Sequence, residues 1–173
     1  MATTKTHPHT HEPHRAPARA VTAGISFAKG QAGDRLTDTR ELVLRIMLEE
    51  NKPMTAYELL DLLGNRTGRA RNPPTIYRAL EFLLDEGFIS RLESLNAYTV
   101  CAHLGEQHVC LFFLCNCCKE ATEITDPDIE SRLMAAASKL GFRAEGRTIE
   151  VDGLCHKCHG EHVAGHGSGE DSH

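Results

Sequence analysis

Two Cys-x-x-Cys pairs are the residues of this chain whose spacing most clearly predicts chemistry. The first pair is Cys115 and Cys118, and the second is Cys155 and Cys158. Each pair can bring two thiolates onto one ion, and two pairs complete the tetrahedral shell that Zn²⁺ prefers in structural sites. Such a shell leaves no open position for catalysis. The pattern therefore predicts a tetrathiolate zinc site that stabilises a small domain.

Disulfides and thiol redox chemistry are the alternatives for these cysteines. The chain has seven cysteines, an odd number, and no apolar segment of the secretory type near its N-terminus. We therefore expect a cytoplasmic protein, in which paired cysteines indicate metal or redox chemistry. A redox pair of the thioredoxin type needs only one Cys-x-x-Cys. Cys117 leaves a Cys115-x-Cys117 pairing open, and Cys110, inside an apolar run, is interpreted as a buried small hydrophobe.

A local concentration of arginine is the second chemical signal. The formal net charge is −5, yet the stretch from Leu62 to Leu80 holds four arginines and no acidic residue. Such a patch favours nucleic acid as a partner, with a solvated loop as the alternative. The chain has no Trp, which argues against a stacking platform for single strands. No apolar run approaches the ~20 residues of a membrane span, so no membrane partner is expected.

The elements expected around this patch have the order helix, helix, helix, hairpin. Apolar periodicity predicts helices over residues 37–49, 56–63 and 73–86. Strand-type residues over 88–93 and 97–101 predict a hairpin. This order is that of a winged helix-turn-helix, which places one helix in the major groove of double-stranded DNA. The outer face of the third helix would then carry Thr75, Tyr77 and Arg78.

Local signals set the ends of the first two helices. Asp38 with Glu41 matches a capping box, and Thr55 can cap the second helix. Gly64 is expected to end that second helix.

The second half of the chain predicts a small α/β domain. Residues 109–114, 120–124 and 147–151 are predicted to be strands, the first a strand buried on both faces. A helix is expected from Pro127 to Leu140, with an apolar stripe that begins at Ile129.

The expected organisation has five parts. Residues 1–33 form a His- and Pro-rich disordered tail, 34–101 the winged helix-turn-helix domain, 102–108 a metal-binding link, 109–160 the domain with the zinc site, and 161–173 a second disordered tail.

A resemblance to a known family rests on these motifs. The run Asn72-Pro-Pro-Thr-Ile-Tyr-Arg-Ala-Leu-Glu-Phe-Leu-Leu-Asp-Glu-Gly87 resembles the recognition helix of the ferric uptake regulator superfamily. Ala56 to Leu63, Glu93-Ser94 and Gly153-Leu154-Cys155 resemble its zinc uptake regulator branch. The resemblance covers residues 34–160. It implies an α+β fold: a winged helix-turn-helix domain followed by a small α/β dimerisation domain with the tetrathiolate zinc site.

The resemblance also implies a function and further site residues. The family comprises homodimeric, metal-activated repressors, and the match adds Tyr57 to Arg78 as a DNA contact. Cys101, His108 and Glu123 align with regulatory metal ligands of the zinc branch. A ligand set drawn from wing, link and sheet would couple metal binding to the placement of the two domains.

The fourth regulatory ligand is where the sequence departs from the branch. That branch often has His or Asp at the start of the wing, and this chain has Ser90. His103 is our expected substitute, with water or Glu93 as other choices.

The predicted function is that of a zinc-responsive repressor. As a homodimer with one structural and one regulatory zinc ion per protomer, it would bind palindromic operator DNA and control zinc uptake genes. A thiolate at Cys101 beside imidazoles favours Zn²⁺ over Fe²⁺ or Mn²⁺. The alternatives are a sensor of the same superfamily for another metal or peroxide, a zinc-dependent hydrolase, and a zinc-stabilised interaction module. We expect no enzyme, since the sequence has no His-Glu-x-x-His motif and no nucleophile elbow.

Overall fold

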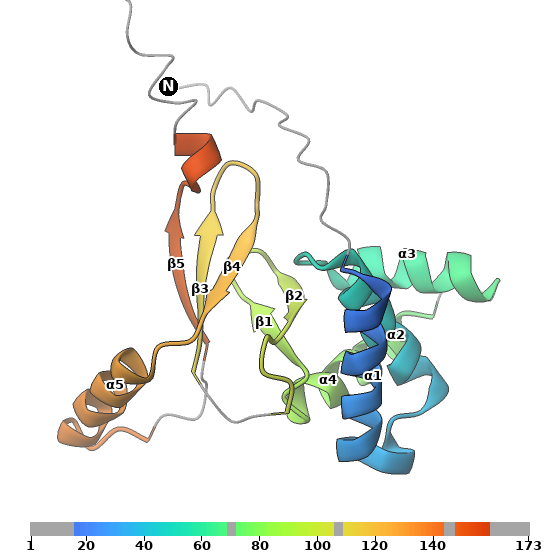
Figure 1. Cartoon of the computed structure of the whole chain (residues 1–173), viewed down its shortest axis with the longest axis horizontal. Coiled ribbons are helices and arrows are strands. Elements are labelled where there is room, and N and C mark those ends of the chain that lie inside the picture. Colours follow the sequence, from blue (N-terminus) through green and yellow to red (C-terminus); the bar gives the residue numbers. More distant parts are fainter. Residues whose placement is uncertain (1–15, 69–71, 106–108, 144–147, 160–173) are drawn as a thin grey trace, which may run out of the picture.

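The computed structural model describes residues 16–68, 72–105, 109–143 and 148–159. A helical unit with a β-hairpin stands beside a three-stranded sheet with one helix (Figure 1). The elements are α1 (Ala18–Ala32), a 3-10 turn η1 (Gly33–Arg35), α2 (Asp38–Glu50), α3 (Ala56–Thr67), α4 (Pro73–Asp85), β1 (Ile89–Leu92), β2 (Ala97–Val100), β3 (Cys110–Cys115), β4 (Ala121–Ile124), α5 (Pro127–Lys139) and β5 (Thr148–Gly153).

The helical unit is the predicted winged helix-turn-helix. Its core is filled by the inward faces of α2, α3 and α4, and Leu59 and Leu83 are fully buried there. β1 and β2 pair antiparallel, with Ile89 opposite Val100, and form the wing. The outer face of α4 is left to solvent, which positions it to meet a partner.

The ends of α3 agree only in part with the sequence prediction. The predicted cap at Thr55 is confirmed, and the structure shows that it is part of a capping box. Its hydroxyl accepts from the Glu58 N–H at 3.2 Å, and the Glu58 carboxylate accepts from the Thr55 N–H at 2.7 Å. The predicted stop at Gly64 is wrong, because α3 continues to Thr67. Gly68, with φ +63, adopts the left-handed conformation that closes a helix.

The start of α2 also differs from the prediction. Thr37 occupies the N-cap position without a side-chain cap bond, and the expected Asp38–Glu41 capping box is absent. The Glu41 carboxylate instead meets Lys29 at 2.9 Å and Arg45 at 2.9 Å. Two cations attract this carboxylate more strongly than one backbone N–H does.

A helix within the predicted N-terminal tail corrects the expectation of disorder over 1–33. α1 packs along α2 and buries Val21, Ile25 and Ala28. These positions are four and three apart, so they share one helical face. Alanine and glycine dilute that apolar period in the sequence, which is why the tail prediction was wrong here. Residues 1–15 lie outside the described part of the chain, as do 160–173 with the second predicted tail.

The second unit is built on β3, the central strand of the order β4-β3-β5. β3 pairs antiparallel with β4 and parallel with β5. The prediction that β3 is buried on both faces is wrong at Phe113, which is 47% exposed.

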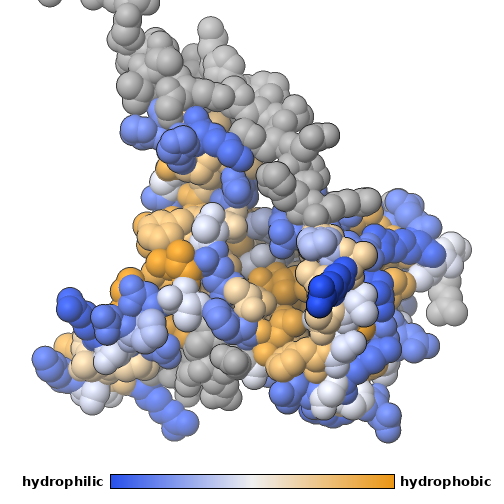
Figure 2. Space-filling model, in the orientation of Figure 1, coloured by the Kyte–Doolittle hydropathy of each residue, from blue (hydrophilic) through white to orange (hydrophobic). Residues whose placement is uncertain are grey.

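α5 lies to one side of the sheet and buries none of its residues in the single chain (Figure 1). Asp126 caps its start: the Asp126 carboxylate accepts from the Asp128 N–H at 2.9 Å and the Ile129 N–H at 3.2 Å. The predicted stripe is present but unpartnered: Ile129 and Leu133 are each 39% exposed. Hydrophobic surface also gathers over the sheet above α5 (Figure 2).

A carboxylate of the sheet makes one of the contacts with the wing. Glu150 of β5 accepts from the backbone N–H groups of Glu93, at 2.7 Å, and Ser94, at 3.0 Å, and from the Ser94 hydroxyl. Burial opposes ionisation of Glu150, but these bonds outweigh it and lower the pKa of the carboxyl. Over the described residues, every helix is too short or too polar to cross a bilayer.

Candidate metal centre and nucleic-acid interface

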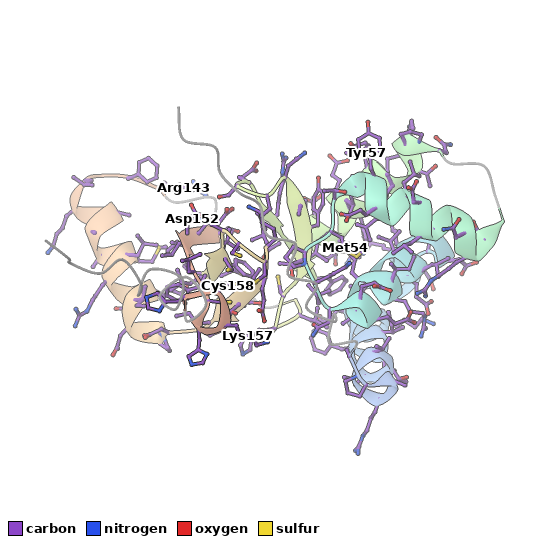
Figure 3. All side chains as sticks on the ribbon, turned by 90° about the horizontal axis from the view of Figure 1, so that it is seen from above. Met54, Tyr57, Arg143, Asp152, Lys157 and Cys158 are labelled. Carbon is purple, nitrogen blue, oxygen red and sulfur yellow. The ribbon has the colours of Figure 1, made fainter. Side chains whose placement is uncertain are left out.

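The backbone of the sheet brings the two cysteine pairs together. Cys115 ends β3 and lies opposite Gly153 at the end of β5 in the parallel register. The Asn116 N–H donates to the Gly153 carbonyl at 2.8 Å and continues that alignment into the turn. The chain then places Cys118 in the β3–β4 turn and Cys155 and Cys158 just after β5. Figure 3 shows Cys158 at this end of the sheet unit.

The four sulfur atoms of Cys115, Cys118, Cys155 and Cys158 lie within 4.8 Å of one another. The Sγ atoms of Cys118 and Cys155 are 3.8 Å apart. A tetrahedron with Zn–S bonds of ~2.3 Å has edges of about 3.8 Å, so the thiols already have the spacing of a zinc shell. Cys117 is not part of this group, which favours Cys118 over the alternative pairing.

Local electrostatics prepare one of these thiols for a cation. Burial raises the pKa of Cys115, but N–H groups of Cys155, Cys118 and Cys117 outweigh it and lower the pKa to about 6. The Cys155 N–H lies 3.3 Å from the Cys115 sulfur. Burial raises the pKa of Cys118 to about 11. Zinc binding would have to displace the Cys118 proton, because thiols bind zinc as thiolates.

Within the described residues, the predicted regulatory ligands are not gathered into one cluster as the four cysteines are. Cys101 is 4% exposed at the end of the wing, and Glu123 lies on β4 with its carboxylate 2.8 Å from the Ala102 N–H. His103 places its Nδ1 3.2 Å from the Thr125 hydroxyl. His108 lies outside the described residues. Within the described ranges, the tetrathiolate cluster is the one group with three or more ligand atoms in mutual reach, so the regulatory set stays a prediction.

Cys101 has buried polar neighbours that were not predicted from the sequence. The Ser90 hydroxyl lies 3.0 Å from the Cys101 sulfur and 3.4 Å from the Cys110 sulfur. Hydrogen bonding to the Cys110 thiol, followed by burial, raises the pKa of Cys101. The apolar neighbours of Cys110 suggested a packing residue only. Its partner Ser90 lies 20 positions earlier, so spacing gave no sign of the contact.

A cavity of about 920 Å³ lies between α1, the wing and the sheet. Cys101 and Glu123 line it, so solvent and small ions can reach the predicted regulatory residues. Its rim also carries the lysines Lys52, Lys119 and Lys157.

The predicted DNA contacts lie on exposed surface of the winged helix-turn-helix. Tyr57, in the first turn of α3, is 70% exposed, and Tyr77 on α4 is 47% exposed. Arg78 is exposed beside it, and Thr75 is half-buried. Figure 3 shows Tyr57 on the helical unit, well apart from the labelled cysteine. This surface can offer a guanidinium and hydroxyl groups to base edges and phosphates.

Arg66, from the predicted basic stretch, has another role. Its guanidinium lies 2.6 Å from the Glu49 carboxylate and ties the end of α3 to α2. Arg69 and Arg71 lie outside the described residues.

Comparisons with known proteins agree with this arrangement. The ferric uptake regulator family model matches residues 31–152. The zinc uptake regulation protein of Escherichia coli (strain K12) is 41% identical over 130 residues, which are 74% of this chain and 75% of that protein. A solved zinc uptake regulator complexed with zinc and DNA aligns with a TM-score of 0.74 and 36% identity, covering 83% of this chain and 97% of that one. The holo form of a regulator named XcZur aligns with a TM-score of 0.71 and 42% identity, covering 82% and 99%.

The match spans the winged helix-turn-helix and the sheet through β5, and the relatives cover both units in the same order. On these grounds, the chain belongs to the ferric uptake regulator family.

Proposed function

We propose that this protein is a zinc-responsive transcriptional repressor, which binds palindromic operator DNA as a zinc-loaded homodimer and controls zinc uptake genes. One observation carries the proposal: an exposed α4 face with Tyr77 and Arg78 on a winged helix-turn-helix, in a chain that also holds a preformed tetrathiolate cluster. The likeness to a zinc uptake regulator complexed with zinc and DNA supports it.

Zinc at the tetrathiolate cluster has a structural role in this proposal. Cys115 and Cys158 are 3% and 1% exposed, so the shell is part of the core of the sheet unit. Four thiolates complete a tetrahedron and leave no position for water or substrate. We therefore propose no catalytic role for this ion.

A second, regulatory zinc would bind where the wing meets the sheet. Cys101 ends the wing and Glu123 belongs to β4, so an ion held by both fixes one unit against the other. His103 and His108 complete the ligand set that the sequence predicts. Zinc binding and DNA binding are then linked, because both favour one placement of the winged helix-turn-helix unit.

The homodimer is proposed from the exposed apolar surface of the sheet unit. Ile129 and Leu133 form a stripe on α5, and Val151 on β5 is also 39% exposed. An apolar helix face without a partner favours pairing with a second copy. A two-fold dimer presents two α4 helices, which match the two halves of a palindromic site.

The test is operator binding measured against free zinc. A palindromic promoter probe is titrated with protein under reducing conditions at several buffered zinc, iron and manganese concentrations. We expect zinc to tighten binding at lower free concentrations than iron or manganese. Cys101→Ser is expected to keep one zinc ion and a folded dimer while its DNA affinity no longer follows added zinc.

Cys117→Ser is the matched control, because Cys117 lies outside both proposed shells. It should keep the wild-type dependence on zinc. If Cys101→Ser also kept that dependence, the regulatory site would lie elsewhere. Binding of the wild-type protein that ignores zinc altogether would contradict the proposed function.

A further inference from the structure

We propose that Cys110 is a ligand of the regulatory zinc ion, on the same shell as Cys101 and Glu123. The inference rests on the proposed function and names a residue that the sequence analysis interpreted as a packing residue.

The first argument is the contact between the two thiols and one hydroxyl. Ser90 Oγ lies 3.0 Å from the Cys101 sulfur and 3.4 Å from the Cys110 sulfur. The three side chains come from β1, from the end of the wing and from the first residue of β3. Their exposed fractions are only 4–6%. Two thiols that converge on one point from separate elements are what a two-sulfur ligand set requires.

The second argument is the chemistry of the surrounding core. Cys101 and Cys110 belong to a small apolar cluster with Phe112 and Leu114. A side chain that only filled space there would need no polar neighbour, yet the buried Ser90 hydroxyl points at both sulfurs. Once the thiols lose their protons, that hydroxyl can donate to a thiolate, as outer-shell partners of metal ligands do.

The third argument is the position of Glu123. Its carboxylate accepts from the N–H of Ala102, the residue that follows Cys101. This bond ties the Glu123 carboxylate to the backbone next to Cys101. The three ligand atoms are not in mutual reach in the structure, so a shared ion would draw the carboxylate toward the two thiols. Cys101 and Glu123 also line the cavity between the units, which gives an ion a path from solvent.

With Cys110 as a ligand, the regulatory zinc ion would hold the wing and the sheet unit together more rigidly than a shell without Cys110. Cys110 begins β3 and pairs with Thr148 of β5, so it belongs rigidly to the sheet unit. An ion bound to Cys101 and Cys110 joins the two ends of the interdomain link directly. Two thiolates also favour zinc over iron and manganese more strongly than one thiolate does.

The test uses Co²⁺ as a spectroscopic probe of the second site. Full-length protein is prepared with zinc in the tetrathiolate cluster only and is titrated with Co²⁺ under anaerobic conditions. Each thiolate ligand adds sulfur-to-cobalt charge-transfer absorption in the near ultraviolet. We expect Cys110→Ala and Cys110→Val to lose about half of this absorption and to bind zinc more than about tenfold more weakly, because losing even an outer-shell partner costs roughly 10–100-fold.

In Cys110→Val an apolar side chain still fills the space of the thiol but cannot bind metal, so this variant separates the loss of a ligand from the loss of packing. Cys117→Ser is the control and should keep the full band. If the Cys110 variants keep the wild-type band while Cys101→Ser abolishes it, the site has one thiolate and the inference is wrong, although the proposed function stands. If the wild-type protein takes up no second ion and its DNA binding ignores zinc, both fail.

Discussion

At the scale of single residues, Arg78 is the side chain on which the proposed DNA recognition depends most directly. It is exposed on the second turn of α4, and among the described residues it makes no hydrogen bond or ion pair. A guanidinium with no internal partner is available for bidentate contact with a guanine edge. We expect Arg78→Ala to weaken specific operator binding by roughly 1–3 kcal/mol and to leave zinc content unchanged. Fluorescence anisotropy with specific and scrambled probes measures the difference.

Arg143→Ala is the matched control for that substitution. Arg143 is an exposed arginine of the sheet unit, which Figure 3 shows on the side away from Tyr57. It should bind operator DNA as the wild type does. Equal affinities for Arg78→Ala and Arg143→Ala would exclude α4 as the element that reads the sequence.

Cys118 provides the second prediction at this scale. Cys118→Ser removes one of four thiolates whose spacing fits a single zinc ion. We expect the tightly held zinc to be lost and the sheet unit to melt at a lower temperature, because zinc binding can contribute on the order of 10 kcal/mol to small domains. Zinc content by mass spectrometry and thermal unfolding by circular dichroism measure both effects. Retention of that zinc by Cys118→Ser, with loss in Cys117→Ser instead, would reverse the assignment.

At the scale of elements, the contact of α1 with α2 gives a pH prediction. The hydrogen bonds from Lys29, then from Arg45, lower the pKa of Glu41 below its usual value of 4.5. A carboxyl with a depressed folded pKa stabilises the fold above its unfolded pKa, and the contribution is lost as pH falls through the folded value. We expect Glu41→Gln to cost under about 1 kcal/mol at pH 7, since Lys29 is exposed.

The cost of Glu41→Gln should begin to shrink as the pH falls below about 4.5 and should disappear once the pH is below the lowered folded pKa. Urea unfolding of both proteins from pH 7 to pH 3 measures it. Glu81→Gln, on the exposed face of α4, is the control and should show no such convergence. A constant difference between Glu41→Gln and wild type at all pH values would mean that packing, not charge, is responsible.

Elements with strong local signals were predicted well. α4 begins with two prolines and carries its apolar residues on one face, and the wing follows directly. The cysteine cluster was predicted because metal chemistry restricts ligand spacing. α1 was missed because its buried face is largely Ala28, Ala32 and Gly24, residues that carry little apolar signal. Gly64 was misread as a stop because the Arg66–Glu49 ion pair, which holds the last turn of α3, joins residues far apart in sequence.

The candidate regulatory site was likewise predicted only in part from the sequence. Cys101 and Glu123 came from a family resemblance, whereas the contact of Cys110 with Ser90 came only from the structure. Three elements meet at that point, and no periodicity within one element reports on the other two.

At the scale of the whole molecule, α5 requires a partner. It buries no residue in the single chain, and Leu133 lies in the middle of its apolar stripe. We expect Leu133→Asp to shift the protein from dimer to monomer in analytical ultracentrifugation, because a charge in an apolar interface loses its hydration without gaining a partner. The structural zinc should remain. Operator affinity should fall, since a monomer meets only one half-site.

Arg132→Ala, at the neighbouring exposed position of α5, is the control for Leu133→Asp. It should remain a dimer at the same protein concentration. A dimeric Leu133→Asp protein would place the interface on another surface.

The central position of β3 has a consequence for how the chain is synthesised. β3 and β5 pair in parallel although they lie far apart in sequence, and Cys118 and Cys155 are separated by 37 positions. Non-local parallel pairing is slow because the loop must close before any contact forms. As the ribosome releases the chain from its N-terminal end, the winged helix-turn-helix is complete long before β5 emerges. One edge of β3 therefore stays unpaired until β5 has left the exit tunnel, and the zinc shell can close only after Cys155 and Cys158 follow.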